Sequence, residues 1–112
     1  MLYIVEGPSG SGKSSIAESS SLRKMTSITT RKPRDSEQHQ VDYYFYSIID
    51  WNDLMEKGEI VEWTKYDGQF YGLSKTTVDL MLQEHKDVFC IMDKNGVKQM
   101  KKNYDENKIK VI

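Results

Sequence analysis

The segment from Gly7 to Ser14 carries the residue types best suited to chemistry. Its sequence, Gly-Pro-Ser-Gly-Ser-Gly-Lys-Ser, has the glycine, lysine and serine spacing of a phosphate-binding loop. Glycines let the backbone curl so that successive N–H groups face phosphate oxygens, and a following helix adds its positive N-terminal end. Lys13 can reach the β- and γ-phosphates of a nucleoside triphosphate, and the Ser14 hydroxyl can ligate Mg²⁺. The residues predicted to bind ATP are Gly7, Ser9, Gly10, Ser11, Gly12, Lys13, Ser14 and Ser15.

A second cluster of functional side chains lies between Thr29 and Glu37, where Pro33 separates Arg31 from Arg34. Arginine presents a planar fork of donors, so two arginines can bind a monophosphate through several charge-assisted hydrogen bonds. A solvated charged loop is the ordinary alternative, and this segment alone leaves both interpretations open.

The pattern of apolar runs predicts an α/β fold, a three-layer sandwich around a parallel sheet. Its strands are expected at residues 2–5, 88–92 and 108–112. Its helices are expected from Lys13 to about Lys24, ending early near Ser19–Ser21, from Ser74 or Thr76 through Leu82, and at Lys94–Lys102.

The middle of the chain has antiparallel β character and reads as an insertion of about residues 29–73. It contains a β-like segment at Val41–Tyr46 and a half-exposed strand at Glu59–Tyr66. Asp67-Gly68 predicts a tight turn after that strand. Asp50 is expected to cap a helix that Gly58 ends.

Composition excludes several classes of protein. Charged residues make up 29% and nearly cancel, with a net charge of −1, so no bulk positive field is available for nucleic acid. No stretch approaches the ~18 apolar residues of a membrane span, and no basic segment with an apolar signal core opens the chain. These features predict a cytoplasmic protein without a nucleic-acid or membrane partner.

The single cysteine and the two histidines carry no predicted chemistry. Cys90 lies in an apolar run and is expected to be a small buried hydrophobe, and one cysteine permits no internal disulfide. His39 and His85 are flanked by polar residues, which predicts surface positions, and neither has metal-ligand spacing.

Several separate motifs, in order and in register from residue 2 to the end, resemble the guanylate kinase family. They are the phosphate-binding loop, Thr-Thr-Arg-Lys-Pro-Arg at 29–34, Asp-Tyr-Tyr-Phe at 42–45, Gly-Glu-Ile-Val-Glu-Trp at 58–63 and Phe-Tyr-Gly at 70–72. The resemblance implies a Mg²⁺-dependent transfer of phosphate from ATP to GMP, giving ADP and GDP. It also implies one domain over residues 1–112, with a core at 1–28 and 74–112 and a GMP-binding insertion at 29–73.

The resemblance also assigns roles to individual residues. Lys13, Arg31 and Arg34 correspond to catalytic groups. The GMP phosphate would be held by Ser27, Arg31, Arg34, Tyr43 and Tyr71. Glu62 would pair with the guanine N–H groups, and Asp93 would lie near the magnesium and the acceptor.

The chain departs from the family pattern in ways that bear on catalysis. Leu73 stands where the family has Ser or Thr, Ile91 replaces an acidic residue, and the helix after the loop is about a turn short. The family continues beyond the strand at 108–112 with an arginine-rich lid, whose loss would reduce phosphoryl transfer by several orders of magnitude.

Three functions therefore remain open: a guanylate kinase-like enzyme, a nucleotide-binding homologue with little or no catalysis, and a module that binds phosphorylated ligands. Lys13 and Ser14 count against the module, which has no need of a phosphate-binding loop. GMP binding is expected to survive better than catalysis. A homodimer that covers an incomplete sheet edge is also expected.

Overall fold

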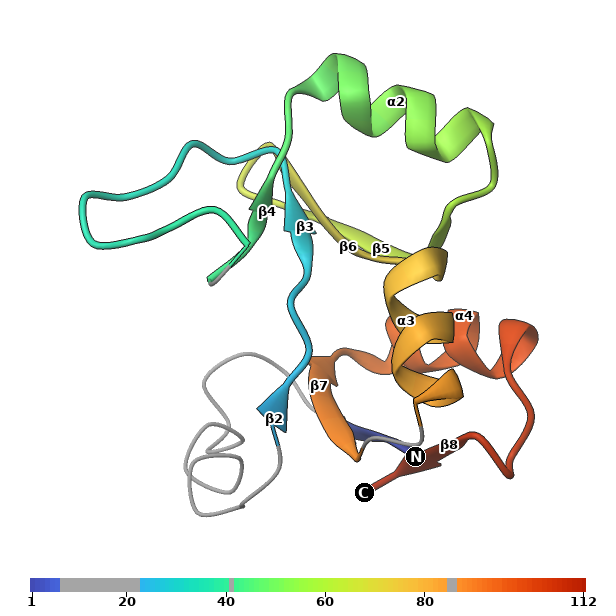
Figure 1. Ribbon diagram of the computed structural model, residues 1–112. Helices are drawn as coiled ribbons and strands as arrows, with labels where there is room; N and C mark the ends of the chain where they lie inside the picture. The colour runs from blue at the N-terminus through green and yellow to red at the C-terminus, as the bar shows by residue number, and fades with distance from the viewer. Residues whose placement is uncertain (7–22, 41, 85–86) are drawn as a thin grey trace. The chain divides into compact units, whose positions relative to one another are not determined.

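The computed structural model describes residues 1–6, 23–40, 42–84 and 87–112, and the chain divides into two compact units. One unit comprises Met1–Met25 and Asp79–Ile112, and the other comprises Thr26–Val78 (Figure 1). The predicted ATP-binding residues at 7–15 and His85 lie outside the described residues.

The first unit contains a parallel sheet of four strands in the order β2-β7-β1-β8. Its strands are β1 (Leu2–Glu6), β2 (Arg23–Lys24), β7 (Val88–Met92) and β8 (Ile109–Val111). The two central strands, β1 and β7, are apolar runs buried along most of their length, which is typical of parallel strands. The three strands expected in this sheet are confirmed. The two-residue strand β2 was not expected, because its exposed Arg23 and Lys24 carry no apolar signal.

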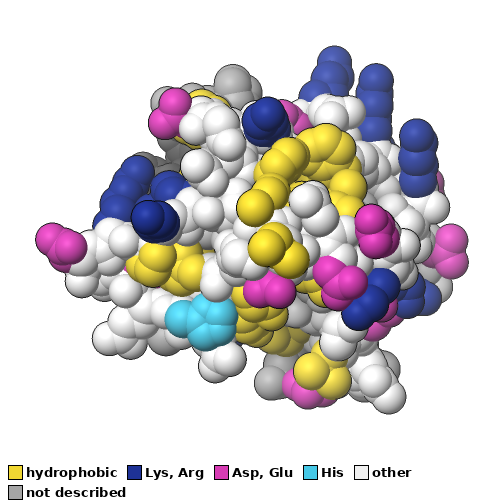
Figure 2. Space-filling view, turned by 90° about the horizontal axis from the view of Figure 1, so that it is seen from above, with side chains coloured by type: hydrophobic (Ala, Val, Ile, Leu, Met, Phe, Trp, Pro, Cys, Tyr) yellow, Lys and Arg dark blue, Asp and Glu magenta, His cyan; other side chains and the backbone are white. Residues whose placement is uncertain are grey.

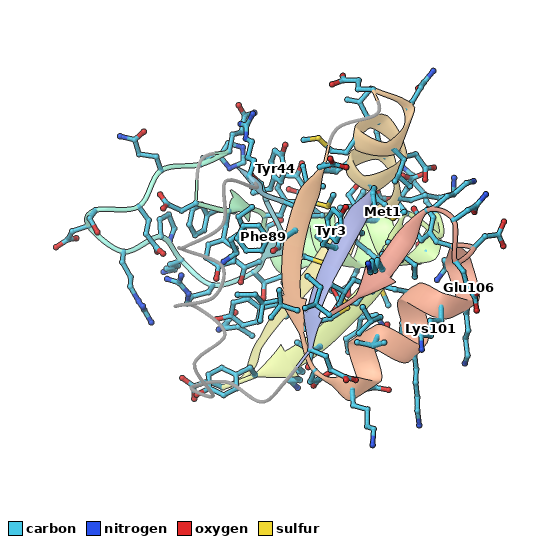
Figure 3. The ribbon with its side chains drawn as sticks, turned by 90° about the horizontal axis from the view of Figure 1, so that it is seen from below. Met1, Tyr3, Tyr44, Phe89, Lys101 and Glu106 are labelled. Atoms are coloured by element: carbon cyan, nitrogen blue, oxygen red, sulfur yellow. The ribbon has the colours of Figure 1, made fainter. Side chains whose placement is uncertain are left out.

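A small apolar cluster lies on this sheet and ties β1 to β7. Val5 and Phe89 are buried there, and Tyr3 and Ile91 pack against them. Figure 3 shows Tyr3 and Phe89 side by side on the two neighbouring strands. Cys90 is buried in β7, as expected.

Helix α4 (Lys94–Asn103) follows β7 directly and buries Gly96, Val97 and Met100 along one face. Asp93 is its N-cap, and the Asp93 Oδ1 accepts a hydrogen bond from the Gly96 amide at 2.9 Å. At the other end, the Tyr104 hydroxyl donates to Asp79 Oδ1 at 2.8 Å. Burial, and then the Asp79 carboxylate, raise the pKa of Tyr104, so this hydroxyl stays a donor.

The second unit contains a mixed sheet in the order β4-β3-β6-β5. Its strands are β3 (Ile28–Thr29), β4 (Tyr44–Phe45), β5 (Ile60–Tyr66) and β6 (Gln69–Ser74). The β3–β4 pair is parallel, and the other two pairs are antiparallel. The α/β fold class, with a parallel sheet and a separate small mixed sheet, is confirmed. Asp67 and Gly68 both have positive φ, at 50° and 78°, which suits the tight turn predicted between β5 and β6.

Helix α2 (Ile48–Glu56) packs on the mixed sheet through Trp51, which is 1% exposed. The Trp51 ring stacks on Phe70 of β6 with the ring centroids 5.3 Å apart. Figure 1 shows α2 along one side of the β5–β6 hairpin. The solvent side of the helix keeps apolar residues, with Ile49 77% exposed. Figure 2, seen from above Figure 1, shows both apolar and acidic side chains on the upper face.

The predicted N-cap of α2 is wrong by three residues. Ser47 caps the helix, and its hydroxyl accepts a hydrogen bond from the Asp50 amide at 3.1 Å. Asp50 therefore lies in the first helical turn, where a carboxylate is favourable beside the positive helix end. Gly58 follows the end of the helix with φ of 71°, in the left-handed conformation expected of a terminating glycine.

Helix α3 (Lys75–Gln83) begins where β6 ends, as the expected Ser74 or Thr76 start implied. Among the described residues, no helix combines the length and the apolar character needed to cross a membrane.

Candidate functional site

Arg31 and Glu37 form the best-defined ion pair of the second unit. Arg31 Nη1 donates to Glu37 Oε1 at 2.9 Å, and Arg31 Nη2 donates to Glu37 Oε2 at 3.0 Å. Both side chains are only 17% exposed. The carboxylate therefore meets the end of the guanidinium in a bidentate pair, the strong and directional form of this interaction.

The Arg31 guanidinium has three further N–H donors besides the two that bind Glu37. Nη1 also donates to the Lys32 carbonyl at 3.1 Å, so both of its hydrogens are used. A guanidinium has five N–H donors in one plane. The other pair, one N–H on Nη2 and one on Nε, bonds to neither Glu37 nor Lys32; it lies along one edge and forms a second fork. This side-on fork has the geometry that a phosphate or another carboxylate accepts.

Aromatic rings surround the Arg31 guanidinium. Its Cζ lies 5.5 Å from the centre of the Tyr43 ring and 5.9 Å from that of Phe45. The Tyr43 ring in turn meets Tyr71 edge-on, with the centroids 6.0 Å apart. The structure thus brings together Arg31, Tyr43 and Tyr71, which come from a loop, from next to β4 and from β6.

The electrostatics of the pair keep both partners charged. The hydrogen bond to Glu37 raises the pKa of Arg31 above its ordinary value, and a hydrogen bond with Tyr71 acts in the same direction. The hydrogen bond from Arg31, followed by that from the Arg34 backbone, lowers the pKa of Glu37 to about 2. The site therefore carries a fixed positive fork beside a fixed carboxylate.

Glu37 also connects the two arginines, a role that the sequence analysis missed. Its Oε1 accepts the Arg34 backbone amide at 2.9 Å, while the Arg34 side chain is exposed. The sequence feature that could have indicated this role is an acidic residue three positions after Arg34 and six after Arg31, in a loop that also carries several cations. Such a residue is easily taken for a solvated surface charge.

Ser27 and Glu62 occupy different parts of the same unit. Ser27 directly precedes β3, and its carbonyl accepts the Tyr44 amide at 2.8 Å. Glu62 lies in β5 next to a β-bulge, opposite Leu73, and is only 7% exposed. A buried carboxylate at a strand irregularity suits recognition of N–H groups better than a solvated one, because little water competes.

Asp93 belongs to the first unit, apart from the six other residues expected to bind the acceptor. Its side chain is engaged as the N-cap of α4. Lys13 and the other residues expected to bind ATP lie outside the described residues, so their contacts stay predictions.

His39, expected at the surface, is exposed and still has a structural role. Its Nδ1 accepts the Phe45 amide at 3.1 Å, and its ring meets those of Tyr44 and Tyr46. The loop that carries Arg31 and Glu37 is thereby tied back to β4.

A hollow of about 530 Å³ lies beside this site. Its lining includes Thr30, Arg31, Phe45, Ile48 and Gln69. Of the residues expected to hold the acceptor phosphate, it includes Arg31 alone. The hollow and the Tyr43–Tyr71 side of the guanidinium are therefore different surfaces.

Within the described part of the chain, no cluster of three or more His, Cys, Asp or Glu side chains could hold a metal. Magnesium bound with a nucleotide takes most of its ligands from phosphates and water, so one or two protein oxygens suffice. The Asp93 carboxylate and the Ser14 hydroxyl are oxygen donors of the type that magnesium prefers. By donor chemistry the described Asp93 suits such a site, and Ser14 lies outside the described residues.

The comparisons with known proteins agree on one family. The model of the guanylate kinase family matches residues 1–111. A guanylate kinase from Enterococcus faecalis is 38% identical over 107 residues, which cover 90% of this chain and 52% of that protein. A guanylate kinase from Idiomarina loihiensis is 36% identical over 112 residues, covering 94% of this chain and 53% of that protein.

The structural comparison gives the same fold. The crystal structure of guanylate kinase from Anaplasma phagocytophilum superposes with a TM-score of 0.73 at 22% identity, covering 99% of this chain and 56% of that one. The chain spans about half the length of the curated relatives it matches.

Proposed function

Since the chain belongs to the guanylate kinase family, we propose that it binds GMP and ATP and transfers the γ-phosphoryl group of ATP to GMP. ADP and GDP are the products. The acceptor nucleotide binds in the unit Thr26–Val78, and the donor binds at the loop of residues 7–15.

The arrangement around Arg31 is the observation that carries this proposal. Its side-on fork is free of the bonds that Glu37 and Lys32 make with the rest of the guanidinium. The phenolic groups of Tyr43 and Tyr71 border the same cation. One fork and two hydroxyls together offer several hydrogen-bond donors to a dianionic phosphate. A neutral ligand would leave most of these donors unused.

The reaction asks little chemistry of the acceptor site. A phosphate oxygen of GMP is already anionic and attacks the γ-phosphorus, while the bond from that phosphorus to the β–γ bridging oxygen breaks and ADP leaves. No protein nucleophile or general base is required. Arg31, Arg34, Tyr43 and Tyr71 orient the acceptor oxygen, and Lys13 neutralises charge on the donor phosphates.

Magnesium fits this scheme as a group shared between ATP and the protein. Ser14 would ligate it, and Asp93 would hold it directly or through water. When bound, it supplies charge neutralisation at the β- and γ-phosphates.

Calorimetric titration of the 112-residue chain with GMP tests acceptor binding. We expect Arg31→Lys to weaken GMP binding by roughly tenfold or more, because an ammonium cannot form a fork with phosphate and a second one with Glu37. Lys32→Ala is the matched control, since this neighbouring cation offers Arg31 only its backbone carbonyl. If the wild-type chain releases no heat at millimolar GMP, the proposal that GMP is the acceptor is wrong.

A coupled assay of ADP release tests the transfer itself, with GMP compared with AMP, CMP and UMP. We expect turnover with GMP alone, abolished by Lys13→Ala. GMP binding without ADP release would instead assign the chain as a nucleotide-binding homologue. Phosphopeptide binding that survives Lys13→Ala but not Arg34→Ala would assign an interaction module.

A further inference from the structure

Strand β3 ends in two threonines immediately before Arg31. Thr29 is fully buried, with no exposed surface. Its hydroxyl donates to the Phe70 carbonyl at 2.9 Å and accepts the Arg31 backbone amide at 3.1 Å. A buried strand position without a polar task is filled best by valine, which has the same shape and leaves no group to satisfy.

Thr30 makes the complementary set of bonds. Its hydroxyl donates to Gln69 Oε1 at 2.9 Å and accepts the Phe70 amide at 3.0 Å. Its own backbone amide donates to the Phe70 carbonyl at 3.1 Å. Both hydroxyls therefore use a donor and an acceptor, and both bond to the backbone of Phe70.

The backbone groups that these hydroxyls bond lie at or next to Arg31 and Tyr71, two of the residues proposed to hold the phosphate. The Arg31 backbone amide donates to the Thr29 hydroxyl, and Tyr71 directly follows Phe70. Thr29 also pairs with Tyr71 in the register of β3 and β6. The two hydroxyls thus connect the end of β3 to β6, at the point where the backbone of Arg31 leaves the sheet.

We propose that the hydroxyls of Thr29 and Thr30 are positioning groups for the phosphate of the acceptor nucleotide. They fix where Arg31 leaves β3 relative to Tyr71 of β6, so that the guanidinium fork and the phenol converge on one phosphate. This inference rests on the proposed function, in which Arg31 and Tyr71 hold the GMP phosphate. Neither threonine touches the ligand in this role.

The test compares GMP with guanosine, which lacks the phosphate. Binding of both is followed through the NMR signals of the ligand, which report millimolar affinities. Thr29→Val keeps the shape of the side chain and removes the hydroxyl. We expect it to weaken GMP binding by roughly tenfold, the factor that corresponds to one good hydrogen bond, and to leave guanosine binding within about twofold.

Two variants serve as references. Thr29→Ser keeps the hydroxyl and should restore the wild-type preference for GMP over guanosine. Thr76→Val removes an exposed hydroxyl that donates to Glu59 Oε2 at 2.9 Å, and it should leave both affinities unchanged. Where circular dichroism shows that Thr29→Val is unfolded, Thr30→Val takes its place with the same expected loss.

Each outcome separates the two proposals. Equal weakening of GMP and guanosine, or an unchanged preference in both valine variants, overturns the positioning role while GMP binding by wild type stands. Failure of wild type to bind GMP overturns the proposed function itself. A selective loss of GMP binding that serine rescues supports the positioning role.

Discussion

At the scale of single residues, the guanidinium of Arg31 does two tasks with one group. Its end-on fork binds Glu37, and its side-on fork, free of Glu37, lies beside Tyr43 and Tyr71. Lysine cannot divide its donors in this way, because an ammonium is a compact charge without a planar fork. The carboxylate thus orients the cation without using the edge proposed for phosphate.

The depressed pKa of Glu37 predicts a specific loss of stability in acid. Its pKa falls from 4.5 to about 2 on folding, so the unfolded chain binds the proton more readily. The pair therefore stabilises the fold fully above about pH 4.5, and this contribution is lost as the pH falls from there towards 2. Urea unfolding at several pH values should show a smaller acid loss in Glu37→Gln than in wild type.

Glu106→Gln is the control for this measurement, because that exposed glutamate lies in the other unit. It should retain the steeper acid loss of wild type. Identical acid profiles for wild type and Glu37→Gln would contradict the lowered pKa of Glu37.

At the scale of elements, the start of α2 depends on Ser47 rather than on Asp50. Ser47→Ala removes the hydroxyl that accepts the Asp50 amide, and we expect a loss of about 1 kcal/mol in the free energy of unfolding. Asp50→Ala removes only a favourable charge in the first turn and should cost a few tenths of a kcal/mol. Thermal denaturation of both variants shows which of them loses more stability. A larger loss of stability in Asp50→Ala would support Asp50 as the N-cap, as expected from the sequence.

Gly72 lets α2 and the β5–β6 hairpin approach each other closely. A Cβ at this position would lie 2.5 Å from the Glu62 carbonyl oxygen and 2.9 Å from the Trp51 ring. A backbone oxygen cannot move away easily, so Gly72→Ala should destabilise the unit by roughly 1–3 kcal/mol. Asn52→Ala on the exposed side of α2 should be neutral or slightly stabilising, and equal melting temperatures for the two variants would contradict the tight packing.

At the scale of the whole molecule, β8 is an edge strand of the parallel sheet formed by the described strands. The Lys108 carbonyl and the Ile112 amide bond to β1, so by alternation the backbone groups of Val111 face away from it, while the outward Ile109 amide already donates to the Asp105 carbonyl. Unpaired edge groups of this kind can pair with another chain. They are the basis for the expected homodimer.

Sedimentation velocity over a range of concentrations tests that association. We expect the 112-residue chain to form dimers, and we expect Val111→Pro to abolish them, since proline removes the outward N–H of the edge strand. Lys102→Ala on the exposed surface of α4 is the control. A single monomeric species at every concentration would exclude the pairing.

The sequence by itself determined the local features of this protein. Apolar runs located β1, β7 and the end of the sheet, Asp67-Gly68 located the hairpin, and the arginine loop located a phosphate site as a hypothesis. These succeed because strand burial, turn conformation and guanidinium chemistry depend on residues close together in the chain. The ATP-binding loop is the strongest motif in the sequence and stays a prediction.

Only the tertiary structure decided how the site is assembled. It joined Thr29 and Thr30 to Phe70, about 40 positions away, and stacked Trp51 over Phe70 against Gly72. It also placed Glu37 on one fork of Arg31 and Tyr71 beside the guanidinium. Composition and periodicity carry no record of such pairings, because their stability comes from burial and geometry that exist only once separate strands meet.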